Sequence, residues 1–192
     1  MASVSDSVIR ELVESNPGQA TFNEYKLVHE TVARRAPCNM LIFGVGRDTP
    51  LWMTTNAGGT TVFLENKERW IKVSRELSPG IVVHRVRYPT LQGLAPVLRY
   101  VPGLLRTWSI PKEVWHTAWD VILVDAPRGT RWYKPGRAMS IYTASVLARR
   151  ATSCDVFVHD TNRATERNAS DWFFGPQKLV EQSGTMRHYR VP

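Results

Sequence analysis

Apolar residues fall into short runs along this chain, and polar stretches with helical periodicity separate them. Residues 4–13 place apolar side chains at helical spacing, which predicts a helix that Pro17 ends. Thr21 and Glu24 have the spacing of a capping box and predict the start of a second helix, which Pro37 ends. Two helices are therefore expected before the first strand.

Beyond these helices, apolar runs alternate with stretches of helical pattern. Runs that are apolar throughout are typical of parallel strands buried on both faces, with helices between them as cover. The sequence thus predicts an open α/β fold with a largely parallel sheet, in which ligands bind beyond the carboxyl ends of the strands. The expected strands are 39–43, 60–64, 81–86, 121–124, 155–158 and 186–191, and the further helices are 68–76, 137–150 and 172–183.

One segment, residues 91–118, fits this alternation poorly because it is rich in proline and tryptophan. Prolines interrupt helices, so one interpretation is a broken crossover helix whose aromatic side chains pack on the core. Loops also carry function, so the other interpretation is a wall over the ligand site. The residues concerned are Pro96, Pro102, Pro111, Trp108 and Trp115.

Composition limits the class of protein and the kind of partner. With 43% hydrophobic and 22% charged residues, the chain is expected to form one globular domain over residues 1–192. It carries no apolar run of transmembrane length and no secretory signal pattern. The net charge of +8 favours an anionic partner. Without a long basic block or paired RNA-binding motifs, acidic small molecules and acidic glycans rank ahead of nucleic acid. The oligomeric state stays open.

Glycines and a carboxylate at strand ends indicate a cofactor site. Gly44 and Gly46 follow the first strand and let a ligand approach the backbone. Glu65 ends the next strand 21 residues after Gly44, a spacing typical of a carboxylate that accepts hydrogen bonds from ribose. The ligand is then NAD or S-adenosylmethionine. Asp48 would repel a pyrophosphate and attract the ammonium group of S-adenosylmethionine, which favours the methyl donor. Two further cofactor contacts are expected, Tyr88 after the third strand and Asp125 after the fourth.

Four longer stretches carry a more specific signal: PCNMLIFGVGRDTPLW, TTVFLEN, WDVILVDAPRGTRWYKPGRAMSIYTA and DVFVHDTNR. Together they resemble the plant glucuronoxylan 4-O-methyltransferase family. The resemblance implies a class I methyltransferase fold, S-adenosylmethionine as donor and methylation of a uronic-acid 4-hydroxyl. Another small-molecule acceptor and a non-catalytic glycan-binding role are the alternatives. A complete chain would be cytoplasmic, and a fragment of an anchored plant-type enzyme would lie in the Golgi lumen.

The strand order of class I methyltransferases brings three titratable residues together. Asp125 then lies between the glycine turn and the pair His159 and Asp160, on strands about 4.8 Å apart. A sugar hydroxyl must lose its proton, so Asp125 or His159 acts as a general base, or Asp125 and Asp160 hold a divalent cation with His159 or Asn162. Oxygen ligands suit Mg²⁺ or Mn²⁺, and a histidine admits Co²⁺. The structural alternative for each carboxylate is a helix cap or turn.

The loop after Asp125 is basic and aromatic, as an acidic-sugar site would require. Arginine pairs bidentately with a carboxylate, and aromatic rings stack on sugar faces. Arg137 is the favoured single contact because it follows Pro135 and Gly136 in the matched motif, and a solvated basic loop is the alternative. The expected acceptor contacts are Arg128, Arg131, Trp132, Tyr133, Lys134, Arg137 and Arg163.

The two cysteines, Cys38 and Cys154, are expected to be free, buried thiols. They precede the first and fifth strands, two strand spacings or roughly 9–10 Å apart, which exceeds the reach of a disulfide. Neither lies in a Cys-x-x-Cys pair, so no zinc site is expected.

Overall fold

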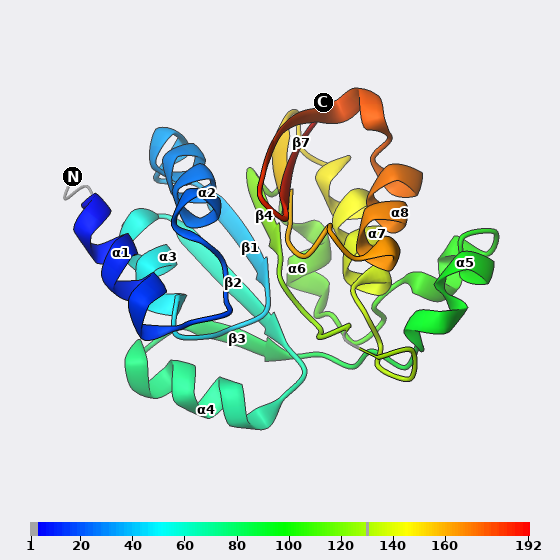
Figure 1. Ribbon diagram of the computed structural model, residues 1–192, viewed down its shortest axis with the longest axis horizontal. Coiled ribbons are helices and arrows are strands. Elements are labelled where there is room, and N and C mark those ends of the chain that lie inside the picture. The colour runs from blue at the N-terminus through cyan, green and yellow to red at the C-terminus, as the bar shows by residue number, and fades with distance from the viewer. Residues whose placement is uncertain (1–3, 130) are drawn as a thin grey trace.

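The computed structural model describes residues 4–129 and 131–192 and contains a seven-stranded sheet (Figure 1). The strand order is β3-β2-β1-β4-β5-β7-β6, which confirms the expected positions of β4 beside β1 and β5 beside β4. The pairs among β1 to β5 are parallel, and β7 runs antiparallel to β5 and β6. The strands are β1 (Asn39–Phe43), β2 (Thr60–Glu65), β3 (Val82–Arg85), β4 (Val121–Val124), β5 (Cys154–Val158), β6 (Leu179–Ser183) and β7 (Met186–Val191).

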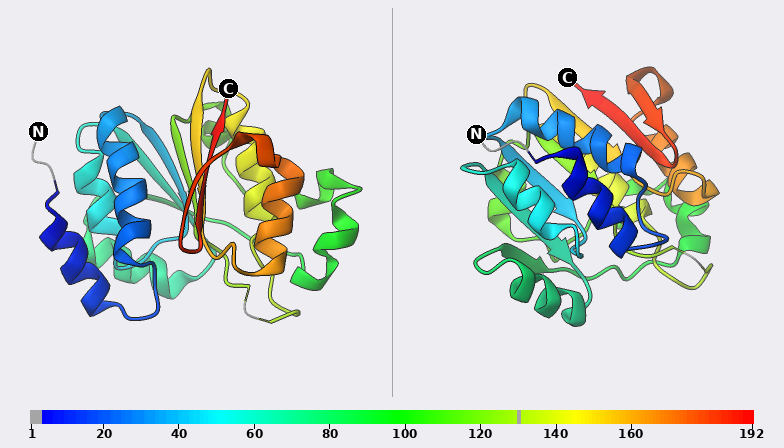
Figure 2. Two further views of the ribbon diagram at one scale, coloured as in Figure 1. Left: turned by 45° about the horizontal axis from the view of Figure 1, so that its top comes forward. Right: turned by 60° about the vertical axis from the view of Figure 1, so that its left-hand side comes forward.

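Helices cover both faces of this sheet (Figure 1, Figure 2). In β1, Met40 and Ile42 belong to a core shared with α1, α2 and α3, whereas Leu41 and Phe43 belong to a core shared with α7. Burial on both sides explains why the strand is apolar throughout. The helices are α1 (Asp6–Ser15), α2 (Phe22–Arg35), α3 (Thr49–Thr55), α4 (Glu68–Leu77), η1 (Gln92–Leu94), α5 (Ala95–Leu98), η2 (Pro102–Leu105), α6 (Lys112–His116), α7 (Ala138–Ala148), α8 (Ala164–Phe173) and η3 (Pro176–Lys178).

Several local predictions are confirmed. At the start of α2, the Thr21 hydroxyl accepts from the Glu24 amide while the Glu24 carboxylate accepts from the Thr21 amide, so the capping box is formed. Cys38 and Cys154 are free and buried. Cys38 precedes β1 and Cys154 begins β5, and β4 lies between these two strands. Within the described residues, no helix is both long and apolar enough to cross a membrane.

The predicted helix over residues 172–183 is wrong. α8 begins earlier, at Ala164, and ends before Gly175, whose φ of 81° is incompatible with a right-handed helix. The last five residues of the predicted helix form β6, which pairs with β7 at the edge of the sheet. Edge strands are exposed and polar, so β6 lacks the apolar pattern by which the inner strands were recognised.

The segment 91–118 is a broken crossover between β3 and β4, made of η1, α5, η2 and α6. Trp115 packs in the core, as the first interpretation required, whereas Trp108 is 71% exposed. The short helix α3 was not predicted. This helix has Pro50 in its first turn, and the helix directly follows the glycine turn after β1.

Candidate active site

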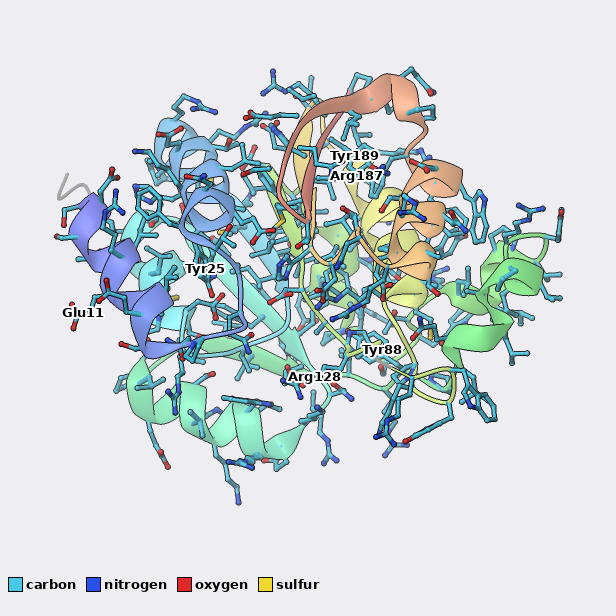
Figure 3. The ribbon with its side chains drawn as sticks, in the orientation of Figure 1. Glu11, Tyr25, Tyr88, Arg128, Arg187 and Tyr189 are labelled. Carbon is cyan, nitrogen blue, oxygen red and sulfur yellow. The ribbon has the colours of Figure 1, made fainter. Side chains whose placement is uncertain are left out.

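A cavity of about 320 Å³ lies at the carboxyl ends of β1, β2 and β4. Its walls come from the turns after these strands and from the connection between α1 and α2, and Figure 3 labels two of the lining side chains, Tyr25 and Arg128. Such a volume suits a small-molecule ligand. The lining includes Asn16, Gln19, Tyr25, Gly44, Gly46, Asp48, Trp52, Glu65, Asn66, Trp70, Asp125, Pro127 and Arg128.

The turn after β1 forms the floor of this cavity. Gly44 has a φ of 118°, and a Cβ atom there would lie 3.2 Å from the Ala126 Cβ, so both conformation and space favour glycine. Its amide donates to the Leu64 carbonyl at 2.8 Å, which joins this turn to the end of β2. The two predicted cofactor elements, the glycine turn and Glu65, therefore lie side by side.

Glu65 is buried, and the backbone holds its carboxylate. Oε1 accepts from the amides of Asn66 and Lys67 at 2.8 and 2.7 Å, and Oε2 accepts from the Val45 amide at 3.3 Å. Burial raises the pKa of this carboxyl, and the three amide bonds partly oppose the rise. The carboxylate is thus fixed at the cavity wall with acceptor capacity left for a ligand hydroxyl.

Asp48 lies in the same cavity and accepts a hydrogen bond from Trp52 Nε1 at 2.8 Å. Burial, together with the nearby charge of Asp125, raises its pKa to about 6. Tyr25 lines the cavity as well, and its pKa is raised by burial and by the charges of Asp48 and Asp125. An anionic wall with an adjacent phenol is suited to a ligand that carries a positive charge.

Asp125, His159 and Asp160 meet where β4 and β5 end, as the strand order predicts. The Nδ1 atom of His159 lies 2.7 Å from Asp125 Oδ1. Asp125 lines the cavity with a side chain that is 35% exposed, and the other two are more buried. Of the three, Asp125 is therefore the residue that a ligand in the cavity can reach.

A buried arginine holds this cluster together. Arg137 Nη2 lies 2.9 Å from Asp125 Oδ1 and 2.6 Å from Asp160 Oδ2, and Nη1 donates to the His159 carbonyl at 2.6 Å. A second arginine, Arg163, lies 2.7 Å from Asp160 Oδ2. Arg137 is only 4% exposed, so its charge has little contact with water. The carboxylates of Asp125 and Asp160 compensate that charge inside the protein.

These contacts set the protonation states. Burial alone would raise the pKa of Asp125, but Arg137 and the hydrogen bond from His159 outweigh it, so this pKa is lowered. Burial alone would lower the pKa of His159, but Asp125 outweighs it, so the pKa of the imidazole is raised. Glu24 contributes from the far side, with Oε2 at 3.8 Å from His159 Nε2. Both shifts favour the charged forms, the carboxylate of Asp125 and the imidazolium of His159.

The backbone at Asp160 has a φ of 63°, in the left-handed region. Aspartate tolerates this conformation better than most residues, but it still costs free energy. The conformation aims the carboxylate back at Arg137 and Arg163, and strain of this kind clusters at functional sites.

The predicted metal ligands do come together, since ligand atoms of Asp125, His159 and Asp160 lie within 4.8 Å of one another. However, Nη2 of Arg137 contacts both carboxylates, at 2.9 Å from Asp125 and 2.6 Å from Asp160, so a cationic side chain already bridges them. The Nδ1 atom of His159 also faces Asp125 rather than an open coordination position. In this arrangement the donor set does not fit a metal ion, because its charge is already neutralised.

A profile of the IRX15/IRX15L/GXM family matches residues 23–102 and 101–189. The chain belongs to this family. It is 35% identical, over 99% of its length, to glucuronoxylan 4-O-methyltransferase 2 of Arabidopsis thaliana, of which it covers 72%. It is 36% identical, over 88% of its length, to Protein IRREGULAR XYLEM 15 of the same plant, of which it covers 60%. The resemblance drawn from the motifs is thus confirmed.

The fold of this IRX15/IRX15L/GXM member is that of class I methyltransferases. A crystal structure of a methyltransferase-like protein from Silicibacter pomeroyi superposes with a TM-score of 0.55, covering 90% of this chain and 87% of that one at 18% identity. The fold class predicted from the apolar pattern is therefore confirmed.

The residues expected to contact the acceptor lie in three different settings. Arg128 lines the cavity. Arg131, Trp132 and Tyr133 are exposed beyond it, and the Tyr133 hydroxyl accepts from Arg131 at 2.7 Å. Arg137, the favoured contact, points inward instead. Two further expected residues are Lys134, which is exposed, and Arg163, which pairs with Asp160.

The loop that carries these side chains is held by the start of the crossover. The amides of Gln92 and Gly93 donate to the carbonyls of Lys134 and Trp132 at 2.7 and 3.2 Å. At Gly129, a Cβ atom would lie 2.6 Å from a carboxylate oxygen of the buried Glu166 and 3.0 Å from the Gly136 Cα, so a side chain there would displace its neighbours. Its exposed arginine and aromatic side chains therefore project from an anchored backbone.

Some members of the site were missed or differently placed. Tyr88, an expected cofactor contact, is not among the cavity-lining residues. Tyr25 and Trp70 do line the cavity, yet nothing in their helical surroundings distinguished them from core residues. Glu24 was recognised only as part of the capping box. It also accepts from the Thr185 amide at 2.6 Å, which fixes it beside His159.

Proposed function

We propose that this protein is an S-adenosylmethionine-dependent O-methyltransferase whose acceptor is a hydroxyl of an acidic sugar, with the 4-hydroxyl of glucuronic acid as the specific target. The observation that carries the proposal is the position of Asp125, whose ionised carboxylate faces the cavity while Arg137 and His159 hold it from behind. The names of the relatives support the acceptor class.

The cavity fits the donor on its own chemistry. Glu65 offers a fixed carboxylate to ribose hydroxyls, and the turn at Gly44 admits a ligand against the backbone. Asp48, once ionised, attracts the ammonium group of the methionine part. Trp70 and Asn66 lie next to Glu65 in the wall, where an adenine ring would be received.

Methyl transfer is an in-line displacement. The bound donor supplies an electrophilic methyl group on a sulfonium; the carbon–oxygen bond forms, the carbon–sulfur bond breaks with its electron pair left on sulfur, and the acceptor hydroxyl loses a proton. Asp125 accepts a hydrogen bond from that hydroxyl, orients an oxygen lone pair towards the methyl group and takes the proton as the bond forms. The proton then passes to solvent.

Asp125 is a better candidate for the base than His159. Asp125 raises the pKa of His159, which favours the protonated imidazole, and Nδ1 of that form would donate to Asp125. The lowered pKa of Asp125 makes it a weak base, but the hydroxyl becomes strongly acidic as its oxygen acquires the methyl group. A weak, well-placed base therefore suffices late in the displacement, and His159 acts by orienting the carboxylate.

In this mechanism, Arg137 supplies the positive charge that a divalent cation would otherwise bring to Asp125 and Asp160. Arg128 at the cavity rim is placed to pair with the carboxylate of the acidic sugar. Trp132 is 72% exposed and offers a ring face to neighbouring sugars. Arg131 and Tyr133 beside it extend the same contact surface.

The test measures transfer of labelled methyl groups from S-adenosylmethionine to acidic xylan oligosaccharides, for the wild type and for Asp125→Asn. We expect a 4-O-methylated product from the wild type, and in the variant a loss of turnover of at least about 100-fold with donor affinity retained by calorimetry. The proposal would be overturned if the wild type did not bind the donor, or if Asp125→Asn turned over at the wild-type rate.

Two further arms sharpen the result. Activity that persists after treatment with a chelator supports Arg137 as the resident cation, whereas activity that requires added Mg²⁺, Mn²⁺ or Co²⁺ contradicts it. Oligosaccharide binding without turnover, with and without these ions, would indicate a non-catalytic role. Methylation of neutral but not acidic acceptors would contradict the role given to Arg128.

A further inference from the structure

The crossover between β3 and β4 exposes a concentration of large apolar side chains. Seven of them between residues 91 and 108 are at least 40% exposed. α5 and η2, which carry Val97 and Leu104, lie at the outer end of the molecule, away from α1 and α4, in Figure 1 and in the left view of Figure 2. We call them the crossover surface: Leu91, Leu94, Val97, Tyr100, Val101, Leu104 and Trp108.

The segment is folded rather than loose, which makes its exposed side chains a defined surface. Ala95 and Leu105 are buried in the core and fix the two short helices from below. The side chains of Val97 and Leu104, close to these anchors, are 66% and 58% exposed. A concentration of exposed apolar side chains along one short, folded segment indicates a surface that another molecule or a lipid layer covers.

The charges in this part of the chain have one sign. Residues 86–112 contain four basic side chains and neither aspartate nor glutamate: the basic residues are Arg87, Arg99, Arg106 and Lys112. The Arg99 guanidinium lies over the ring of Trp172 at 5.0 Å, and that of Arg106 lies over Trp108 at 4.8 Å. The cations are thus held beside the apolar side chains, where they would meet an anionic partner.

The composition of the surface favours lipid over sugar. Leucine and valine offer nothing to the hydroxyls of a glycan, and the side-chain amide of Gln92 is engaged with Thr165 at 3.0 Å. Aliphatic side chains with interspersed tyrosine, tryptophan and arginine are typical of segments that lie in the headgroup region of a bilayer. Long basic side chains there reach anionic headgroups while their stems stay among apolar groups.

We propose that the crossover surface docks on an anionic lipid surface, with Val97, Leu104 and Trp108 entering the headgroup region. The loop that carries Trp132 and Lys134 is hydrogen-bonded to the backbone of Gln92 and Gly93, so docking would also hold the side chains proposed to bind the sugar close to the membrane. This inference is independent of the methyl-transfer chemistry, because none of the cavity-lining residues belongs to the crossover surface.

The test is co-sedimentation of the full chain with phosphatidylcholine vesicles, with and without phosphatidylserine. The variant is Val97→Ser with Leu104→Ser, and the control is Val8→Ser with Leu77→Ser, whose side chains are each 48% exposed on α1 and α4. Circular dichroism of both variants checks that they fold.

We expect the wild type and the control to bind vesicles that contain phosphatidylserine, less strongly at high salt. The crossover variant should bind at least about tenfold more weakly, because two apolar side chains no longer enter the bilayer. No vesicle binding, or equal binding by both variants, would overturn the proposal. The proposal would also be overturned if the crossover substitutions left vesicle binding unchanged and instead abolished self-association or binding to acidic oligosaccharides.

Discussion

Replacing Arg137 by methionine tests the buried cluster most sharply. The substitution places an apolar side chain of similar length in a position that is only 4% exposed. It removes the contacts of 2.9 and 2.6 Å to Asp125 and Asp160 and the hydrogen bond to the His159 carbonyl. Two carboxylates then share a partly buried site without the cation that lies between them.

The expected loss of unfolding free energy depends on the partners that Asp125 and Asp160 keep in the variant. Removing one partner of a buried ion pair costs about 3–5 kcal/mol of unfolding free energy. Here Asp125 keeps His159 and Asp160 keeps Arg163, so we expect about 3 kcal/mol, the lower end of that range. Urea unfolding measures it. Arg75→Met, at an exposed position on α4, is the matched control and should stay within about 0.5 kcal/mol of wild type.

Activity should fall further than stability alone explains. Without Arg137, the Asp125 carboxylate is no longer held in the position from which it orients the acceptor hydroxyl. We therefore expect kcat to fall roughly 100-fold while donor affinity stays unchanged. Arg137→Lys keeps the charge but cannot bridge both carboxylates. It should recover part of the stability and little of the turnover.

If Arg137→Met unfolded like wild type and turned over at the wild-type rate, Arg137 would neither stabilise the cluster nor orient Asp125. A third outcome is equally informative. If the variant raised KM for the acidic acceptor and left kcat intact, Arg137 would be the acceptor contact that its place in the motif suggests, and the buried ion pairs would not persist in the working enzyme.

Three further substitutions probe separate parts of the account. Glu65→Gln should weaken donor binding by about 10- to 100-fold in calorimetry, because a ribose hydroxyl loses a charged acceptor; unchanged affinity would exclude Glu65 from the donor site. Since the pKa of Asp48 is about 6, donor affinity should fall as the pH drops below 6, and Asp48→Asn should abolish that dependence; a variant with the wild-type profile would assign it elsewhere. Burial would raise the pKa of Asp155, but His188, Arg35 and Arg190 lower it to about 2, so its ionised form contributes about 2 kcal/mol above pH 4 that is lost as the pH falls towards 2. Asp155→Asn should flatten this acid limb in unfolding measurements, and an unchanged limb would contradict the assignment.

Strand-end residues were the most predictable part of the site. A parallel sheet places the ends of its strands at one edge, so Gly44, Glu65, Asp125 and His159 could be brought together from strand order alone. The capping box was equally local, since Thr21 and Glu24 are neighbours on one turn of helix. In these cases, the chain itself fixes where the side chain goes.

Side chains whose direction depends on distant partners were not predictable. Arg137 has the sequence context of an exposed loop arginine, but two carboxylates on other segments draw it inward. The second role of Glu24, beside His159, depends on Thr185 at the far end of the chain. β6 was misread for a related reason, because an edge strand needs only one partner and so carries no continuous apolar pattern.

A crystal structure with S-adenosylhomocysteine bound tests the central claim most directly. We expect the ribose hydroxyls on the Glu65 carboxylate, the amino group near Asp48 and the sulfur facing Asp125, with Arg137 still in contact with both Asp125 and Asp160. S-adenosylhomocysteine bound elsewhere, or bound with its sulfur pointing away from Asp125, would contradict the proposed mechanism.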